Sequence, residues 1–218
     1  MGAINQTDFM TAVVGTDPSG WRVPTGFFPP SSPMASDAGL SALTSPRDLG
    51  KVRSDLQEAG YRGEKVVLVV NANAFGPKAC SAVAADAMRK VGIDVDEQIM
   101  DSATWFRRIL SKKPPDEGGW NVLCGILQGT DALSPANHSL LAFPGWPNSE
   151  KIKALRDQWL ETADVTAQRQ IAAEIQAQAF IDVPYYPLGT CYFSTAFRSD
   201  LTGVLDGQAI FWNVRRQG

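Results

Sequence analysis

Five polar residues of the sequence stand directly after two long apolar runs, where they could contact a small ligand. The runs are residues 66–70 and 122–127. The polar residues are Asn71 and Asn73 after the first run, and Gln128, Thr130 and Asp131 after the second. Their amide, hydroxyl and carboxylate groups are those that a small polar molecule needs for recognition. Asn and Asp also close turns throughout proteins, so a purely structural role stays open for these residues.

The sequence lacks the usual signatures of catalysis. It has no Gly-x-Ser-x-Gly motif, no phosphate-binding loop and no dinucleotide-binding glycine pattern. A single histidine, His138, excludes a His-rich metal site, and nothing in the sequence orients it toward a cysteine. The cysteines Cys80, Cys124 and Cys191 are widely spaced and are interpreted as buried small hydrophobic residues. We therefore expect no enzyme, no cofactor and no metal.

The pattern of residues 65–135 predicts strand, helix, strand, helix, strand. The two apolar runs are unbroken, which is typical of strands buried on both faces of a parallel sheet. Pro77 and Gly92 mark the two ends of the first helix, and Ser102 is expected to cap the second. The second helix should turn four apolar residues inward: Trp105, Phe106, Ile109 and Leu110. Because parallel strands end at one edge, the five polar residues should face the same crevice.

Outside this unit, the chain is expected to add helices and two irregular segments, residues 16–44 and 134–148. Residues 16–44 are rich in Pro, Gly and Ser but also contain several large apolar residues, which predicts a docked loop rather than a disordered linker. Ser45 followed by proline should begin a helix that ends at Gly60. Its predicted buried stripe is Leu49, Val52, Leu56 and Ala59. Ser149 and Thr166 are expected to cap two later helices.

The composition narrows the classes of partner. The chain has 218 residues, a formal net charge of -3 and an isoelectric point near 5.2. Without a basic field, nucleic acid is not expected as a partner. No apolar run approaches the ~20 residues that span a bilayer, and the N-terminus has no signal-peptide pattern.

The order of these pieces resembles the periplasmic solute-binding proteins of the peptide/nickel class of ABC transporters, which bind oligopeptides and dipeptides among other solutes. Each passage is weak by itself, but together they cover almost the whole chain in the right order and spacing. The passages are residues 3–15, 45–49, 58–61 (Glu-Ala-Gly-Tyr), 91–95, 101–106 and 176–188, which ends in Val-Pro-Tyr-Tyr-Pro-Leu.

The resemblance implies an α/β, type II periplasmic-binding-protein-like lobe with a mostly parallel sheet. Residues 1–200 would be the second, C-terminal lobe, with 16–44 as its docked irregular loop. Residues 201–218 would be a tail that returns to a missing first lobe. The partners would be that first lobe, a membrane permease and a small-molecule or peptide ligand. The protein would be periplasmic, with its signal peptide outside this sequence. Relatives of this kind also carry opines, sugars, haem and metal chelates, so the ligand stays open.

The resemblance also implies a role for Asp131. In peptide-binding members, an aspartate four residues before a proline holds the terminal ammonium of the ligand, and Asp131 stands four residues before Pro135. Those members usually have a tryptophan three residues before the aspartate, where this sequence has Gln128. Trp146 could supply an aromatic wall instead, or it could anchor a packed loop. The predicted function is the substrate-binding component of a transporter. The alternatives are an effector-sensing domain of a transcription regulator and a small enzyme.

Overall fold

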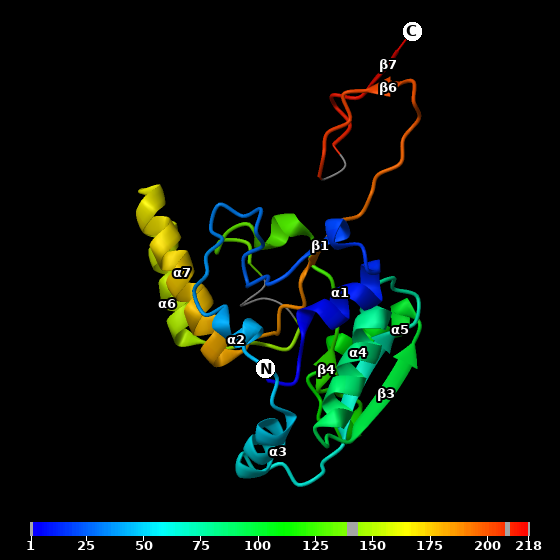
Figure 1. Ribbon diagram of the computed structural model, residues 1–218, viewed down its shortest axis with the longest axis vertical. Helices are drawn as coiled ribbons and strands as arrows, with labels where there is room; N and C mark the ends of the chain where they lie inside the picture. The colour runs from blue at the N-terminus through cyan, green and yellow to red at the C-terminus, as the bar shows by residue number, and fades with distance from the viewer. Residues whose placement is uncertain (1, 139–143, 208–209, 218) are drawn as a thin grey trace.

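The computed structural model describes residues 2–138, 144–207 and 210–217 (Figure 1). Parts of the predicted irregular stretch 134–148 and of the predicted tail therefore lie outside the described residues. The helices are α1 Gln6–Val14, α2 Ser41–Thr44, α3 Leu49–Glu58, α4 Pro77–Lys90, α5 Ser102–Ile109, α6 Glu150–Glu161 and α7 Val165–Asp182. Short 3-10 helices are η1 Pro18–Gly20, η2 Pro115–Glu117 and η3 Gly129–Ala132. The strands are β1 Trp21–Arg22, β2 Val66–Asn71, β3 Val95–Met100, β4 Val122–Leu123, β5 Thr190–Cys191, β6 Leu201–Thr202 and β7 Arg215–Arg216.

Strand β2 lies at the centre of a three-stranded parallel sheet, between β3 and β4. Every residue of β2 pairs with β3, from Val66 opposite Val95 to Asn71 opposite Met100. Only two residues of β2 pair with β4, because the chain leaves the sheet after Leu123. The predicted parallel sheet with helical crossovers is confirmed, but the apolar run 122–127 forms a shorter strand than its length suggests.

The side chains of β2 are buried alternately on the two faces of the sheet. Val67 and Val69 pack against Trp105 of α5, and Leu68 and Val70 pack against Ala85 of α4. One helix therefore covers each face, and no position of the strand can be polar without facing a packed helix. This double burial explains why the sequence of β2 is an unbroken apolar run.

Helix α5 buries a narrower face than the sequence predicts. Trp105 and Ile109 are buried, but Phe106 is 60% exposed and Leu110 is 70% exposed. The prediction of a four-residue inward face was wrong because the sheet has only three strands, so one row of side chains is enough to cover it. The cap also differs, since Asp101 accepts hydrogen bonds from the main-chain nitrogens of the first turn and takes the place expected for Ser102.

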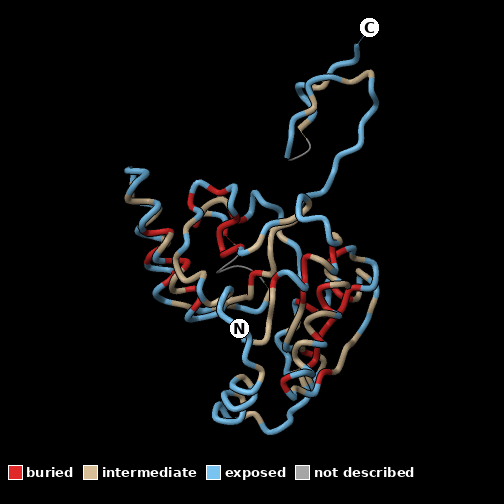
Figure 2. Tube along the Cα trace, in the orientation of Figure 1, coloured by how far each residue is buried: buried red, intermediate tan, exposed pale blue. Residues whose placement is uncertain are grey.

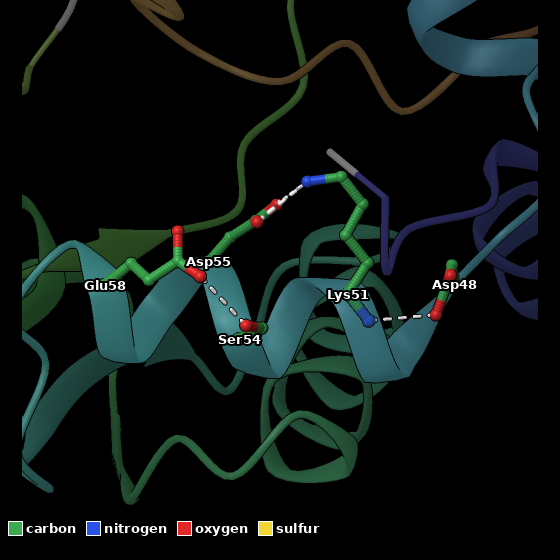
Figure 3. A network of polar contacts seen from close by, with 5 residues as sticks. All are labelled: Asp48, Lys51, Ser54, Asp55 and Glu58. Carbon is green, nitrogen blue, oxygen red and sulfur yellow. Dashed lines mark hydrogen bonds and ion pairs between the residues drawn. The ribbon is translucent and has the colours of Figure 1, made fainter.

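Helix α3 lies at the periphery of the molecule and contributes no buried residue, although its Arg53 donates to the carbonyl of Lys90 at the end of α4 (Figure 1). Its cap is Asp48, because Ser45 instead ends α2 by donating its hydroxyl to the carbonyl of Ser41. The surface of the helix carries a network of polar contacts. In this network, Lys51 forms an ion pair with Asp55 at 2.7 Å (Figure 3). Such exposed pairs contribute little to stability. The predicted buried stripe is only half-buried at three of its positions, and Ala59 is exposed.

Helices α6 and α7 lie side by side and form a second core with the irregular segment before α2 (Figure 1). Ser149 caps α6 as predicted, whereas Asp164 rather than Thr166 caps α7. The buried residues of this core come from both helices and from the segment: Phe27, Phe28, Met34, Ile152, Leu155, Ile171, Ala172, Ile175, Ala179 and Phe180. Residues 23–40 thus lack helix and strand and still supply core side chains.

Two buried glutamine side chains satisfy main-chain groups of this irregular segment. The Gln6 amide donates to the carbonyls of Thr25 (2.8 Å) and Pro187 (2.7 Å), and its oxygen accepts from the Thr25 nitrogen (2.9 Å). The Gln176 amide donates to the carbonyls of Ser36 (2.9 Å) and Ala38 (2.8 Å). Buried main-chain groups without helix or strand partners need such side chains, because leaving them unpaired is costly.

His138 holds the same segment from another side. Its Nε2 donates to the carbonyl of Phe27 (2.5 Å) and lies 3.3 Å from the hydroxyl of Tyr185. The imidazole ring stacks on Tyr185 and meets the edge of Phe28. Burial lowers the pKa of His138 below its ordinary value, because the charged imidazolium would lose its hydration.

Residues 192–207 and 210–217 form an arm that extends from the body of the molecule (Figures 1 and 2). Strands β6 and β7 pair antiparallel within it, and Asp200 pairs with Arg198 and Arg216 at 2.8 Å. None of the described residues of the arm is buried, and Trp212 is 83% exposed. A hairpin this short is not stable by itself, so the arm needs a surface to pack on.

Replacing Gln176 by alanine should destabilise the fold much more than replacing Gln178 on the same helix. Gln176→Ala leaves the half-buried Ser36 and Ala38 carbonyls unpaired and a gap where the fully buried Gln176 side chain lay, and should lower the free energy of unfolding by about 2 to 4 kcal/mol. Gln178 bonds only Asp182 at the surface, so Gln178→Ala should change it by at most about 0.5 kcal/mol. Urea unfolding measures the free energy of unfolding of both variants. Equal losses would contradict the role of Gln176 in holding the irregular segment.

Stability should fall as the solution is acidified below about pH 6.5, the ordinary pKa of histidine. Because the folded-state pKa of His138 is lowered, the unfolded chain binds the proton more readily, so stability is full above that pH and is lost as pH falls toward the folded pKa. The slope for one proton is at most about 1.4 kcal/mol per pH unit. Urea unfolding between pH 7.5 and 5.5 measures it.

His138→Gln is the control for this pH dependence, since glutamine can donate to the Phe27 carbonyl but does not titrate. His138 is the only histidine of the chain. The variant should therefore show nearly constant stability over the same pH range, and an unchanged slope would exclude His138 as its source.

Candidate functional site

Asn71 ends β2 and is buried at the carboxyl edge of the sheet. Its Oδ1 accepts hydrogen bonds from the main-chain nitrogen of Asn73 and from the hydroxyl of Ser102, both at 3.0 Å. These two bonds fix the turn after β2 to the start of α5. Asn71 is therefore placed as a structural residue that positions Asn73.

The other polar candidates of this edge are exposed. Asn73 follows the turn after β2, whereas Gln128, Thr130 and Asp131 lie at the start of η3. The Asp131 nitrogen bonds the Gln128 carbonyl at 2.9 Å, which folds this segment back on itself. Within the described part of the chain, none of these four side chains has a hydrogen-bond partner or an ion pair. They present amide, hydroxyl and carboxylate groups that are open to a ligand.

Trp146 is not brought together with these residues. Its ring lies 5.9 Å from that of Trp120, and the Lys112 ammonium lies 5.4 Å from its centroid. Trp120 precedes β4 and donates its indole N–H to the carbonyl of Ile109, where α5 ends. Trp146 is therefore near the amino end of the strands. Asn71 marks the opposite, carboxyl end, and each strand residue between the two ends adds about 3.3 Å.

Apolar residues that the sequence analysis did not single out also lie at the carboxyl edge. Phe75 follows Asn73 by two residues, and Ile126 precedes Gln128 by two residues. Phe193, at the start of the arm, meets the ring of Phe75 edge-on, with 6.2 Å between centroids. A large apolar residue inside a polar turn was the only local signal for Phe75. The contact with Phe193 depends on the fold and could not be seen in the sequence.

The three cysteines gather in one core cluster with α1 and α4. All are free thiols. Burial raises the pKa of Cys80 to about 12 and that of Cys124 to about 11. Because the thiolate is the nucleophile, such thiols are unreactive at neutral pH. This arrangement suits packing rather than catalysis.

Residues 2–138, 144–207 and 210–217 contain no group of three or more His, Cys, Asp or Glu side chains placed to hold a metal ion. Within the same ranges, every helix is too short or too polar to cross a membrane.

Replacing Asn71 should affect stability, whereas replacing Asn73 should not. Asn71→Ala removes the acceptor for the Asn73 nitrogen and the Ser102 hydroxyl and should cost about 1 to 3 kcal/mol of unfolding free energy. Asn73→Ala removes an exposed side chain and should stay within about 0.5 kcal/mol. Thermal and urea unfolding of the two variants checks this, and a stable Asn71→Ala protein would contradict the structural role.

Sequence comparison finds a similar curated protein. No protein-family model matches the chain. The chain is 25% identical over 220 residues to the probable peptide ABC transporter periplasmic-binding protein y4tO of Sinorhizobium fredii. The match covers 98% of this chain and 41% of that protein.

Solved structures share the fold. DppA of Helicobacter pylori, in complex with the peptide STSA, superposes with a TM-score of 0.74 at 18% identity, covering 100% of this chain and 43% of that one. The dipeptide-binding protein of Pseudoalteromonas sp. SM9913, in complex with Met-Leu, gives 0.73 at 20% identity, with 99% and 43% covered. The chain thus spans about two fifths of the length of these proteins. It has a type II periplasmic-binding-protein fold and is a relative of the periplasmic solute-binding proteins of peptide ABC transporters.

Proposed function

We propose that the chain is the second ligand-binding lobe of the substrate-binding component of an ABC transporter. The transported solute would be a small polar molecule, namely a peptide or peptide-like compound. One observation carries the proposal. Beyond the carboxyl ends of two parallel strands, four polar side chains are exposed and unpaired among the described residues, in a chain related over 98% of its length to a probable peptide ABC transporter periplasmic-binding protein. Parallel α/β sheets bind ligands at this edge.

The proposed roles follow from the chemistry of each side chain. Asp131 would hold the terminal ammonium of a peptide, since its carboxylate is exposed and has no partner of its own in the described part of the chain. Gln128, Thr130 and Asn73 would hydrogen-bond the main-chain amides of the ligand. Asn71 would act through Asn73 by fixing the turn. Trp146 has no role in this proposal because it lies toward the other end of the strands.

The proposed partners are a first lobe and a membrane permease, and the proposed location is the periplasm. Residues 1–200 would form the lobe, and residues 201–218 would pack on the first lobe. The proposal is supported by the absence of buried residues in the described part of the arm, which needs a covering surface. The role is binding rather than catalysis. No observation on the described residues favours an effector-sensing domain of a transcription regulator.

The test of the proposed ammonium anchor uses two probes, Ala-Ala-Ala and its N-acetylated form, which lacks the ammonium. Titrated into the 218-residue chain, the free peptide should shift the NMR signals of the Gln128 and Asp131 amides, and the acetylated peptide should bind several-fold more weakly. Asp131→Asn should abolish the difference. In the 218-residue chain, Asp131→Asn should weaken binding of the free peptide only several-fold, because a solvent-exposed ion pair is weak. Once a second lobe covers the ion pair, the same substitution should weaken binding tens-fold or more.

Asp116→Asn is the matched control, since Asp116 is an exposed aspartate of η2 outside the site. It should leave both affinities unchanged. Equal binding of the free and acetylated peptides would remove Asp131 from the site. Failure of both peptides to shift any amide up to millimolar concentration would count against the proposed function itself.

A further inference from the structure

The carboxyl edge of the sheet is built from segments without a single charged side chain. They are residues 71–77 after β2, residues 122–130 through and after β4, and residues 188–197 through β5 into the arm. Charged residues make up 20% of the chain, so their absence from all three segments sets this edge apart. Each segment is followed directly by a charged residue, which is Lys78, Asp131 or Arg198. The edge therefore suits a ligand that is neutral over most of its length.

Five large hydrophobic side chains from these segments lie exposed, and three of them lie at the turn after β2. Phe75 is 74% exposed, Phe193 56% and Ile126 45%. Phe75 and Phe193 meet edge-on at 68°. Ile126 reaches the turn that carries Phe75, because a Cβ on Gly76 would lie only 2.8 Å from its Cδ1. Gly76 also has a φ of +81°, which favours glycine. We call these three residues the Phe75 cluster.

The Phe75 cluster is more than a chance exposure of single residues. Isolated apolar residues are common on protein surfaces, but here three residues from distant segments gather at one edge. The edge-to-face contact holds the two rings in place before any ligand arrives. A ligand that packs on them therefore loses little additional side-chain freedom, which favours binding.

Resting on the proposed function, we propose that the Phe75 cluster receives an apolar side chain of the ligand. Asn73 and Gln128 stand two residues from Phe75 and Ile126, so hydrogen-bonding amides and apolar surface alternate along this edge. A peptide with a hydrophobic side chain satisfies both, since its main chain pairs with the amides and its side chain covers the cluster. A sugar or another wholly polar solute would leave the apolar surface in water. The solute class is thus peptides, or peptide-like compounds, with hydrophobic side chains.

The experiment titrates Ala-Ala-Ala and Ala-Phe-Ala into the 218-residue chain and follows two sets of NMR signals. The amides of Asn73 and Gln128 report on peptide binding as such, and the Cδ1 methyl of Ile126 reports on the cluster. Ala-Phe-Ala should bind about fivefold more tightly or better, because part of its ring leaves water. Only Ala-Phe-Ala should shift the Ile126 methyl strongly.

Phe75→Ser should remove the preference for Ala-Phe-Ala and leave the affinity for Ala-Ala-Ala unchanged. Phe75 is too exposed for its loss to unfold the chain, and circular dichroism checks this. The matched control is Phe106→Ser, which removes an aromatic ring of similar exposure from α5. This control should keep the full preference for Ala-Phe-Ala.

Three results would overturn the inference. Equal affinities of the two peptides, with the Asn73 and Gln128 amides still shifting, would remove the cluster from the site and leave the proposed function standing. A shift of the Ile126 methyl with protein concentration alone would mean that a second copy of the chain covers the cluster. No shift with either peptide would count against the proposed function and the inference together.

Discussion

The burial of β2 on both faces is the constraint from which the rest of the sheet follows. Leu68 and Val69 have no exposed surface, so each face of the strand must be covered by a helix. Helices can reach both faces only if the strands are joined by crossovers, and such strands run parallel. Parallel strands end at one edge, which brings Asn73 and Gln128, far apart in sequence, to the same side of the molecule. The geometry of the candidate site is thus a consequence of core packing.

The second core, formed by α6, α7 and residues 23–40, is built differently, because it includes a segment with neither helix nor strand. Phe27 and Phe28 are buried there, which carries their main-chain groups into the core as well. Gln6, Gln176 and His138 supply the partners that a sheet would otherwise provide. The polar side chains in this core therefore serve the same purpose as the ladder of β2, because they pair main-chain groups of a segment that packs into the core.

Features that depend on local sequence could be predicted, whereas features that depend on contacts between distant residues could not. The unbroken apolar run of β2 and the bounds of α4 could be predicted because burial and helix ends leave local signals. The cap of α5 could not, since Asp101 and Ser102 are both good capping residues and only the fold assigns Ser102 to Asn71. From the sequence alone, a polar residue such as Gln176 would be expected on the surface of an amphipathic helix, although it is fully buried. For the candidate site, the sequence indicates that polar residues follow two strands, but the place of Trp146 depends on its contact with Trp120.

Phe193 links the candidate site to the arm, because it contacts Phe75 at the edge of the sheet and also begins the segment that leaves the body. A surface that packs against the arm would therefore lie beside the site. Any ligand on Asn73, Gln128 and Asp131 would then be enclosed between two surfaces, and water would be excluded from the contacts. Exclusion of water strengthens a carboxylate's attraction for a cation several-fold. The same covering step that stabilises the arm would thus turn an open, weak site into a selective one.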